Sequence, residues 1–393
     1  MSEEKLVPKL RFSGFDDEWT KINLGELSKI GKGFTPSTSN PSFWDGELYW
    51  LSIAALNQGK YIKQTSKKIS LEGSKNKDPI EKGTLLMSFK LSLGKLGILT
   101  KDMYTNEAIC NFKWKNNNIS TEYMYYYLSS INIMKYGSQA AKGITLNNET
   151  LNTIPVILPN FDEQNKISNF LSKIDKKIEL LEKKHQAYED FKKYLMQQIF
   201  TQKLRFADYN EYSLKQILEK IENGFSGTQV NYETPFPVTR IETISSGIIN
   251  YNKVGFVDHI PERYLLKEGD ILLTNINSIK WIGNSVYFDG KRVLYHGMNL
   301  MLLRSKKEIN SKYLYYYITY NNNWFKKMAC QAVNQASINK STLEKFIVKI
   351  PDFETQNNIA NVLSLTDEKI NRISNQVDLT RKFKKGLLQQ MFV

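Results

Sequence analysis

Two stretches of the chain place mostly apolar residues alternately four and three positions apart. The positions of the first stretch are Ile167, Leu171, Ile174, Ile178, Leu181, His185, Tyr188, Lys192, Leu195 and Ile199. The matching positions of the second are Ile359, Leu363, Thr366, Ile370, Ile373, Val377, Thr380, Lys384, Leu387 and Met391. This spacing is typical of long helices that pair along one apolar side as a coiled coil. At 1.5 Å per residue, a helix of about 40 residues would be about 60 Å long.

A short extended segment ending in proline, at Pro159 or Pro351, precedes each stretch. Asn160 or Asp162 can cap the first helix, because a side-chain oxygen at such a position accepts a hydrogen bond from a backbone N–H of the first turn. The two lysines on the apolar side each directly follow a phenylalanine. We therefore expect the apolar side to shift by one position where these lysines occur.

The two stretches belong to an internal repeat. Residues 139–201 align without a gap to residues 331–393, and about two positions in five are identical. Upstream, LSKIGKGFT is repeated as LEKIENGFS, EKGTLLMS as KEGDILLT, and EYMYYYL as KYLYYYI, at slightly different offsets. A period of about 190 residues is far longer than the unit of a repeat array. It predicts a first domain at 1–158 with its helix at 159–206, and a second domain at 207–350 with its helix at 351–393.

The segments before the two helices alternate short apolar runs with turns. Examples are GTLLMSF and LGKLGILT in the first segment, and GDILLTNI and NLMLLRS in the second. Such runs predict strands. The tyrosine-rich segments EYMYYYL and KYLYYYI predict one helix in each domain, whose aromatic side chains we expect in the core. The fold class is therefore α+β, with two mixed α/β domains.

The chain is basic. It has 54 lysines and arginines against 40 aspartates and glutamates, which gives a formal net charge of +14 and a pI of about 9.3. This excess favours a polyanionic partner such as nucleic acid, or an acidic protein surface. No apolar run approaches the length of about 20 residues that a membrane helix needs, and MSEEKLVPKLRF lacks the pattern of a signal peptide. We expect no membrane partner and a cytoplasmic location.

The sequence has no catalytic motif. It has no G-x-x-x-x-G-K-[ST] phosphate loop, and Gly31-Lys32-Gly33 lacks the further glycine and the acidic residue of a dinucleotide site. Neither an Asn/Asp-Pro-Pro-aromatic tetrapeptide of amino-methyltransferases nor a G-x-S-x-G motif occurs. Two cysteines and three scattered histidines do not suggest a metal site. We expect a non-catalytic chain with no metal or cofactor of its own.

The order of the motifs resembles that of the specificity subunits of type I restriction-modification systems. The first half carries KGFTPSTSNPSFWDGELYWLSI, EKGTLLMSFKLSLGKLGI, EYMYYYL and ETLNTIPVILPNFDEQNKISNFLSKIDKKI. The second half repeats the order with KEGDILLTNINSIKWIGN, KYLYYYI and STLEKFIVKIPDFETQNNIANVL. The resemblance covers almost the whole chain, and the full order in duplicate is highly specific. One departure is Gly33-Phe34-Thr35-Pro36, which becomes Gly224-Phe225-Ser226-Gly227 and predicts a different early loop in the second domain.

In that family, two target-recognition domains, each followed by a long helix, form a pseudo-twofold subunit that binds a bipartite sequence of double-stranded DNA. The resemblance implies that the two helices pair as an antiparallel coiled coil, and that the chain docks methylation and restriction subunits. It also implies that those partner subunits use S-adenosylmethionine, ATP and Mg. A duplicated domain on a fixed pair of helices would hold two DNA-recognising surfaces at a set distance.

Candidate DNA contacts are polar and basic residues in loops next to strands. Asn and Gln can pair twice with adenine, Lys can donate to guanine, and basic side chains also position phosphates. The candidates for base contacts are Thr35, Ser37, Lys90, Ser92, Lys95, Gln139, Lys142 and Thr145 in the first domain, and Asn275, Asn277, Ser278, Lys280, Gln331, Asn334 and Gln335 in the second. The candidates for phosphate contacts are Lys60, Lys63, Lys67, Lys68, Lys75, Lys77, Arg240, Lys253, Lys291 and Arg292.

Two other classes of function remain open. A single-chain restriction-modification enzyme would modify DNA alone, but it would need the motifs that this sequence lacks. A dimeric coiled-coil transcription regulator would bind its operator without other subunits, and it would not need an internal duplication.

Overall fold

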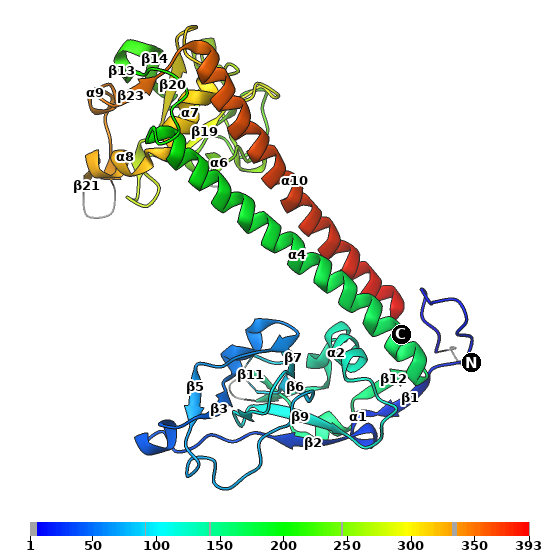
Figure 1. Cartoon of the computed structure of the whole chain (residues 1–393). Helices are drawn as coiled ribbons and strands as arrows, with labels where there is room; N and C mark the ends of the chain where they lie inside the picture. The colour runs from blue at the N-terminus through cyan, green and yellow to red at the C-terminus, as the bar shows by residue number, and fades with distance from the viewer. Residues whose placement is uncertain (1–5, 91, 141–142, 245–246, 332–335, 393) are drawn as a thin grey trace. The chain divides into compact units, whose positions relative to one another are not determined.

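The structure is a computed structural model of the whole chain (Figure 1), which describes residues 6–90, 92–140, 143–244, 247–331 and 336–392. The chain divides into two compact units, Met1–Glu182 with Asn375–Val393, and Lys183–Ser374. Each unit contains one domain, the first part of the long helix that follows this domain, and the last part of the other long helix.

The first domain is built on a mixed sheet with the strand order β2-β9-β6-β7-β4. The strands are β2 (Ser28–Lys32), β4 (Tyr61–Ile62), β6 (Leu85–Ser88), β7 (Leu96–Leu99) and β9 (Ile109–Trp114). Neighbours are antiparallel except β4 and β7, which are parallel. Every residue of β6 and β7 is buried, which explains why both strands are continuous apolar runs in the sequence.

The other elements of this domain surround the main sheet. They are β1 (Thr20–Asn23), α1 (Leu24–Leu27), β3 (Leu48–Leu51), β5 (Lys67–Ile69), β8 (Tyr104–Thr105), α2 (Thr121–Ser130), β10 (Ser138–Ala140), β11 (Gly143–Thr145), α3 (Asn148–Asn152) and β12 (Pro155–Leu158). A second sheet has the order β5-β3-β8. β1 and β12 pair antiparallel, so the start and end of the domain are joined directly before the long helix.

The core of the first unit lies between the main sheet, α2 and the long helices. Tyr123 and Tyr126 on α2 are fully buried, which confirms the prediction that the tyrosine-rich segment packs in the core. Leu171 and Met391, one from each long helix, belong to the same buried cluster. The ring of Phe392 lies 5.5 Å from that of Tyr123. Met391 and Phe392 therefore complete the core of the first unit.

The second domain has a main sheet with the order β14-β20-β17-β19, antiparallel throughout. These strands are β14 (Leu218–Asn223), β17 (Ile271–Thr274), β19 (Ser285–Tyr287) and β20 (Leu300–Ser305). The other elements are β13 (Asn210–Ser213), α5 (Leu214–Ile217), β15 (Pro237–Val238), α6 (Ile241–Ile244), β16 (Gly255–Phe256), β18 (Ile276–Asn277), α7 (Ser311–Tyr320), α8 (Asn322–Met328), β21 (Cys330–Gln331), β22 (Ala336–Ser337), α9 (Lys340–Leu343) and β23 (Ile347–Ile350). Tyr313 and Tyr316 on α7 are buried beside Phe200 and Leu363 of the long helices.

The long helices are α4 (Phe161–Phe200) and α10 (Phe353–Met391). Asn160 caps α4, because its Oδ1 accepts a 3.0 Å hydrogen bond from the backbone N–H three residues later. Asp352 caps α10 through the equivalent bond of 2.9 Å. Neither these nor the other helices in the described part of the chain have the length and hydropathy needed to cross a membrane.

A glutamine in the first turn of each long helix accounts for part of the similarity between the two halves. Gln164 Nε2 donates to the Pro159 carbonyl at 3.0 Å, and its Oε1 accepts from the Ser120 backbone N–H at 2.9 Å, at the start of α2. Gln356 makes the equivalent two bonds, of 3.0 and 2.9 Å, at the start of α7. One glutamine thus joins the tyrosine-rich helix to the long helix in each domain.

The two lysines on the apolar side form ion pairs between the long helices. In the first unit, Lys384 Nζ lies 2.5 Å from Asp175 Oδ1. In the second, Lys192 Nζ lies 2.6 Å from Asp367 Oδ1. The predicted shift of the apolar side at these lysines is therefore wrong. The phenylalanines that precede them, which a shift would bury, are 50% and 57% exposed.

The helices pair antiparallel within the first unit. Glu182 lies farther along α4 than Asp175, and its partner Arg381, at 2.5 Å, lies earlier on α10 than Lys384. The predicted fold class, two mixed α/β domains each followed by a long helix, is confirmed. The approximate twofold axis concerns the mutual placement of the units and stays a prediction.

Candidate nucleic-acid interface

Strand register brings the predicted base-contacting loops of the first domain to one end of its main sheet. The end of β2 lies opposite the start of β9, which in turn lies opposite the end of β6. The end of β6 lies opposite the start of β7. The loop after β2, with Thr35 and Ser37, therefore lies at the same sheet end as the turn that carries Lys90, Ser92 and Lys95.

Thr35 is held by the loop that precedes β9. Its hydroxyl accepts a 2.9 Å hydrogen bond from Asn106 Nδ2 and donates to the Glu107 carboxylate. The exposed Ser37 lies near, with its Oγ 2.7 Å from that of Ser39. Asn106 and Glu107 were not predicted, although their position directly before the apolar strand AICNFKW could have indicated them. Amide and carboxylate groups are among those that recognise base edges.

A glycine sets the course of the early loop in both domains. A Cβ at Gly33 would lie 2.1 Å from the Thr105 carbonyl, which accepts a 2.8 Å bond from the Phe34 N–H. A Cβ at Gly224 would lie 1.8 Å from a backbone carbonyl of the facing loop, and the Phe225 N–H makes the equivalent 2.8 Å bond. The predicted difference between the early loops therefore begins only after the Gly-Phe pair.

The turn between β6 and β7 contains three predicted residues in different settings. Lys95 is half-buried and its Nζ donates to Asn57 Oδ1 at 2.7 Å. The Ser92 carbonyl accepts a bond from the Ser88 hydroxyl. Lys90 is exposed. Lys90 is therefore the more accessible cation of the two lysines in this turn.

A hairpin is anchored beside this turn in each domain. The Leu146 N–H, after β11, donates to the Phe89 carbonyl at 3.2 Å, and the Ile338 N–H, after β22, donates to the Asn275 carbonyl at 2.9 Å. The predicted residues in these hairpins are Gln139 in β10, Thr145 in β11 and Gln331 in β21, described by their backbone. Lys142, Asn334 and Gln335 lie outside the described residues.

The second domain gathers its candidates at the equivalent sheet end. Asn275 directly follows β17 and is only 3% exposed. Its Nδ2 donates to Asn223 Oδ1 at 3.4 Å, and its Oδ1 is buried with no hydrogen-bond partner within the described residues. Asn277 Oδ1 accepts from the Ser278 N–H at 2.7 Å. Ser278 and Lys280 are exposed, so they are the accessible candidates of this loop.

The predicted phosphate contacts fall into different settings. Arg240 is exposed and lies 3.6 Å from the Glu242 carboxylate. It follows Thr239, whose hydroxyl accepts a 2.8 Å hydrogen bond from the segment before β20.

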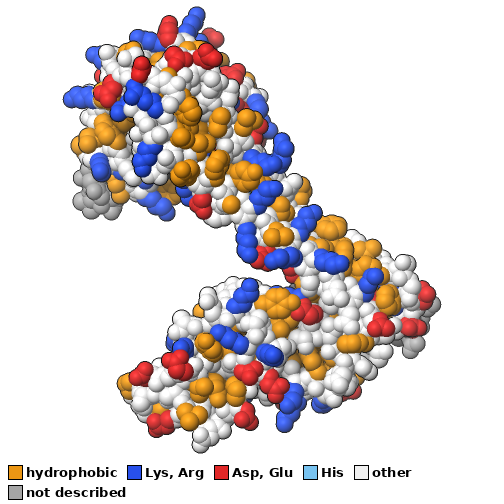
Figure 2. All heavy atoms as spheres, in the orientation of Figure 1, with side chains coloured by type: hydrophobic (Ala, Val, Ile, Leu, Met, Phe, Trp, Pro, Cys, Tyr) orange, Lys and Arg blue, Asp and Glu red, His pale blue; other side chains and the backbone are white. Residues whose placement is uncertain are grey.

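On the face that Figure 2 shows, lysine and arginine side chains are spread among acidic ones over both domains. Net charge alone therefore does not locate the DNA-binding surface, and the sheet-end loops define the candidate.

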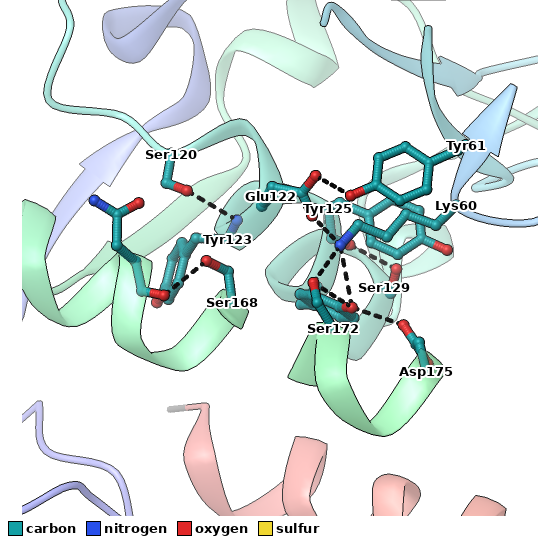
Figure 3. Close-up of polar contacts among 12 residues, drawn as sticks. Lys60, Tyr61, Ser120, Glu122, Tyr123, Tyr125, Ser129, Ser168, Ser172 and Asp175 are labelled. Carbon is teal, nitrogen blue, oxygen red and sulfur yellow. Dashed lines mark hydrogen bonds and ion pairs between the residues drawn. The ribbon is translucent and has the colours of Figure 1, made fainter. Parts of the chain in front are cut away.

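Lys60 is not a surface cation, contrary to its prediction as a phosphate contact. Its side chain is 8% exposed and pairs with the Glu122 carboxylate. Figure 3 shows its Nζ pointing to Ser172. The Ser172 Oγ lies 2.7 Å from this Nζ, which also donates to the Tyr126 hydroxyl at 3.2 Å. Burial lowers the pKa of Lys60 to about 8, although Asp175 acts to raise it. Lys60 therefore joins the sheet to α2 and α4.

A Tyr-Asp-Lys triad fastens each domain to both long helices. The Tyr126 hydroxyl donates to Asp175 Oδ2 at 2.6 Å, and the other oxygen of this carboxylate pairs with Lys384 of α10. The second unit has the same triad, with a 2.8 Å bond from Tyr316 to Asp367 and the ion pair to Lys192. One carboxylate on a long helix thus bonds both to the tyrosine-rich helix of the domain and to the other long helix.

Replacing the central carboxylate, as in Asp175→Asn, is expected to lower the free energy of unfolding by about 1–3 kcal/mol, because a partly buried ammonium loses its partner. Glu182→Gln, which removes the more exposed pair with Arg381, is the control and should cost less than about 1 kcal/mol. Urea denaturation of the two variants measures both values. Equal losses would mean that the triad contributes no more than a surface ion pair.

The described residues provide no evident metal site. Among residues 6–90, 92–140, 143–244, 247–331 and 336–392, no group of three or more His, Cys, Asp and Glu side chains could hold a metal ion. Cys110 is buried, and burial raises the pKa of its thiol. His296 is buried too, which lowers its pKa to about 4, and its Nε2 lies 3.0 Å from the Leu300 carbonyl. Both residues are part of the packing of their domains.

Curated relatives are similar to this chain over about half of it or over almost its whole length. A putative type I restriction enzyme MjaX specificity subunit of Methanocaldococcus jannaschii is 40% identical over 193 residues, which cover 47% of this chain and 45% of the relative. The type I restriction enzyme MjaVIII specificity subunit of the same organism is 24% identical over 409 residues, covering 94% of this chain and 89% of the relative.

Solved structures share the fold. The S subunit of a type I restriction-modification system from M. genitalium superposes with a TM-score of 0.64 at 17% identity, covering 98% of this chain and 99% of that one. A structure that describes complex assembly and conformational transition of the type I R-M system gives 0.62 at 15% identity, covering 97% and 99%.

The model of the type I restriction modification DNA specificity domain matches the chain twice, at residues 16–189 and 207–379. Each match comprises one domain and most of the long helix that follows it. The chain therefore belongs to the type I restriction-modification DNA specificity family, and it is a specificity subunit.

Proposed function

We propose that each domain recognises one half of a bipartite sequence in double-stranded DNA. The observation that carries this proposal is the repetition of one arrangement in both domains. In each domain, the loop after the first strand of the main sheet (β2 or β14), the loop after β6 or β17, and an anchored hairpin lie at the same sheet end. Because the loop sequences differ between the domains, the two half-sites differ.

The DNA contacts divide between the bases and the backbone of the duplex. Lys90, Ser278 and Lys280 are exposed in the sheet-end loops, where they can reach base edges. Thr35 and Asn106 reach bases with the hydroxyl and amide that already bond each other. Arg240 and other exposed lysines of the domains position the phosphates.

Methylation and restriction subunits dock on the long helices. Exposed phenylalanines support this part of the proposal, since large apolar side chains in water favour a protein partner. The first unit exposes Phe161 and Phe383 by 40% and 57%, and the second exposes Phe353 and Phe191 by 48% and 50%. These are equivalent positions in the two halves, so each unit offers a similar docking surface.

The chain itself is non-catalytic, and S-adenosylmethionine, ATP and Mg are used by the partner subunits. The purified chain, mixed with S-adenosylmethionine and DNA, should transfer no methyl groups, and adding the methylation subunit should produce site-specific transfer. The measurement is incorporation of radiolabelled methyl groups into DNA, with the methylation subunit alone as control. Methyl transfer by the purified chain alone would refute this assignment, and it would favour the single-chain enzyme.

A further inference from the structure

In the first domain, the contact between α2 and α4 encloses an ammonium group. Lys60 Nζ lies 4.5, 5.1 and 5.7 Å from the ring centres of Tyr126, Tyr61 and Tyr125, within the range of about 6 Å for cation–π attraction. Its N–H groups also reach Ser172 (Figure 3), and they donate to the Tyr126 hydroxyl. The site therefore combines aromatic faces with hydrogen-bond acceptors, which together suit a primary ammonium.

The second domain keeps most of these groups but has a cavity where the lysine would lie. Tyr315, Tyr316 and Ser364 are the repeat equivalents of Tyr125, Tyr126 and Ser172. They line a cavity of about 320 Å³. In the first domain Lys60 directly precedes β4, the edge strand beside β7. The main sheet of the second domain ends at β19 within the described residues, so the element that supplies this lysine has no counterpart there.

Two more tyrosines complete the aromatic lining of the cavity. Tyr287 and Tyr251 line it with Tyr315 and Tyr316, and the rings of Tyr287 and Tyr315 lie 6.2 Å apart. The hydroxyl of Tyr251 is buried without a hydrogen-bond partner among the residues that the structure describes. The cavity therefore offers four tyrosines and an unused polar group.

The charged groups of the lining are three carboxylates and one lysine, namely Asp289, Asp367, Glu368 and Lys312. Asp367 forms an ion pair with Lys192, and Asp289 forms one of 2.7 Å with Lys291. Glu368 is exposed at the rim. Lys312 stands at the position of Glu122 in the first domain, with its Nζ 5.5 Å from the Tyr287 ring centre. Because Asp367 and Asp289 already pair with lysines, Glu368 is the lining carboxylate that can stabilise a further cation.

We propose that this cavity of the second domain binds a primary alkylammonium group, which takes the place that Lys60 fills in the first domain. The group is either that of a free polyamine or that of a lysine side chain. Its N–H groups donate to Ser364 and the Tyr316 hydroxyl, and the aromatic faces and Glu368 stabilise its charge. An ammonium without N–H groups interacts only with the aromatic faces and Glu368, because it cannot donate hydrogen bonds.

Titration of the full chain with n-butylammonium by calorimetry tests the proposal. One saturable site per chain is expected, because the first domain is filled by Lys60. The Asn371→Lys variant places an ammonium on α10 at the cavity wall, and it should weaken binding by about tenfold or more through charge repulsion and competition. Asn361→Lys is the matched control, since Asn361 is exposed on the same helix but does not line the cavity, and its binding should be unchanged.

n-Butyltrimethylammonium should bind more weakly, because it cannot donate hydrogen bonds. Putrescine represents a free polyamine, and Nα-acetyl-lysine amide represents a lysine side chain. The compound that binds more tightly identifies the source of the ammonium group. The proposal is overturned by the absence of saturable binding, by equal binding of the Asn371→Lys variant and the wild type, or by equal binding of the trimethylated compound.

Discussion

Exchanging residues 21–153 for the matching segment of another specificity subunit is expected to replace one half of the recognised DNA sequence and to leave the other half unchanged. The first domain has its own main sheet and buried cluster, and β1 pairs with β12 to close it before α4 begins. The long helices, including Gln164 and Asp175, stay outside the exchanged segment. A foreign domain with the equivalent tyrosine can therefore bond to them.

Sequencing of the methylated DNA sites measures this exchange, and the equivalent exchange of the second domain serves as its control, since it should replace the opposite half. A change in both halves after either exchange would mean that the two domains do not recognise DNA separately.

Inserting four residues into both long helices, after Glu182 in α4 and after Ser374 in α10, is expected to keep both half-sequences and to lengthen the gap between them. Four helical residues add about 6 Å, which is roughly two base pairs at about 3.4 Å each. Four residues are close to one turn, so the apolar side stays nearly continuous, with some local unwinding. If the helices set the separation of the half-sites, the gap must follow their length.

Both helices must be extended because each Asp-Lys pair lies wholly within one unit. Extending α4 alone is the control, since it would leave one of these pairs out of register and should reduce the amount of folded, assembled protein. A fully active variant with both insertions and an unchanged gap would show that the helices do not set the distance.

The sequence predicted the features that depend on local pattern. The spacing of apolar positions identified both long helices, Asn160 capped the first as expected, and the tyrosines of α2 and α7 are in the core. The spacing alone, however, indicates that a lysine at an apolar position does not fit the pattern. It could not show that Lys192 and Lys384 meet Asp367 and Asp175, because these partners come from the other helix.

The candidate interface could be predicted only in part. The sequence placed the candidates in loops next to strands, and the antiparallel register brings these loops to one sheet end in each domain. Burial was not predictable: Lys60 is enclosed by residues far away in the sequence, and Asn275 is covered at the end of β17. Glu107 was missed because a single acidic residue in a turn is usually a solvated surface charge, whereas here it holds Thr35.

Recognition of two half-sites by two domains is tested most directly by sequencing the methylated positions in DNA from cells that express this chain with its methylation subunit. The expected motif has two short and different sequences separated by a fixed number of unspecified bases. One uninterrupted sequence, or a motif whose two parts stand at variable distances, would contradict recognition by two domains held on one pair of helices.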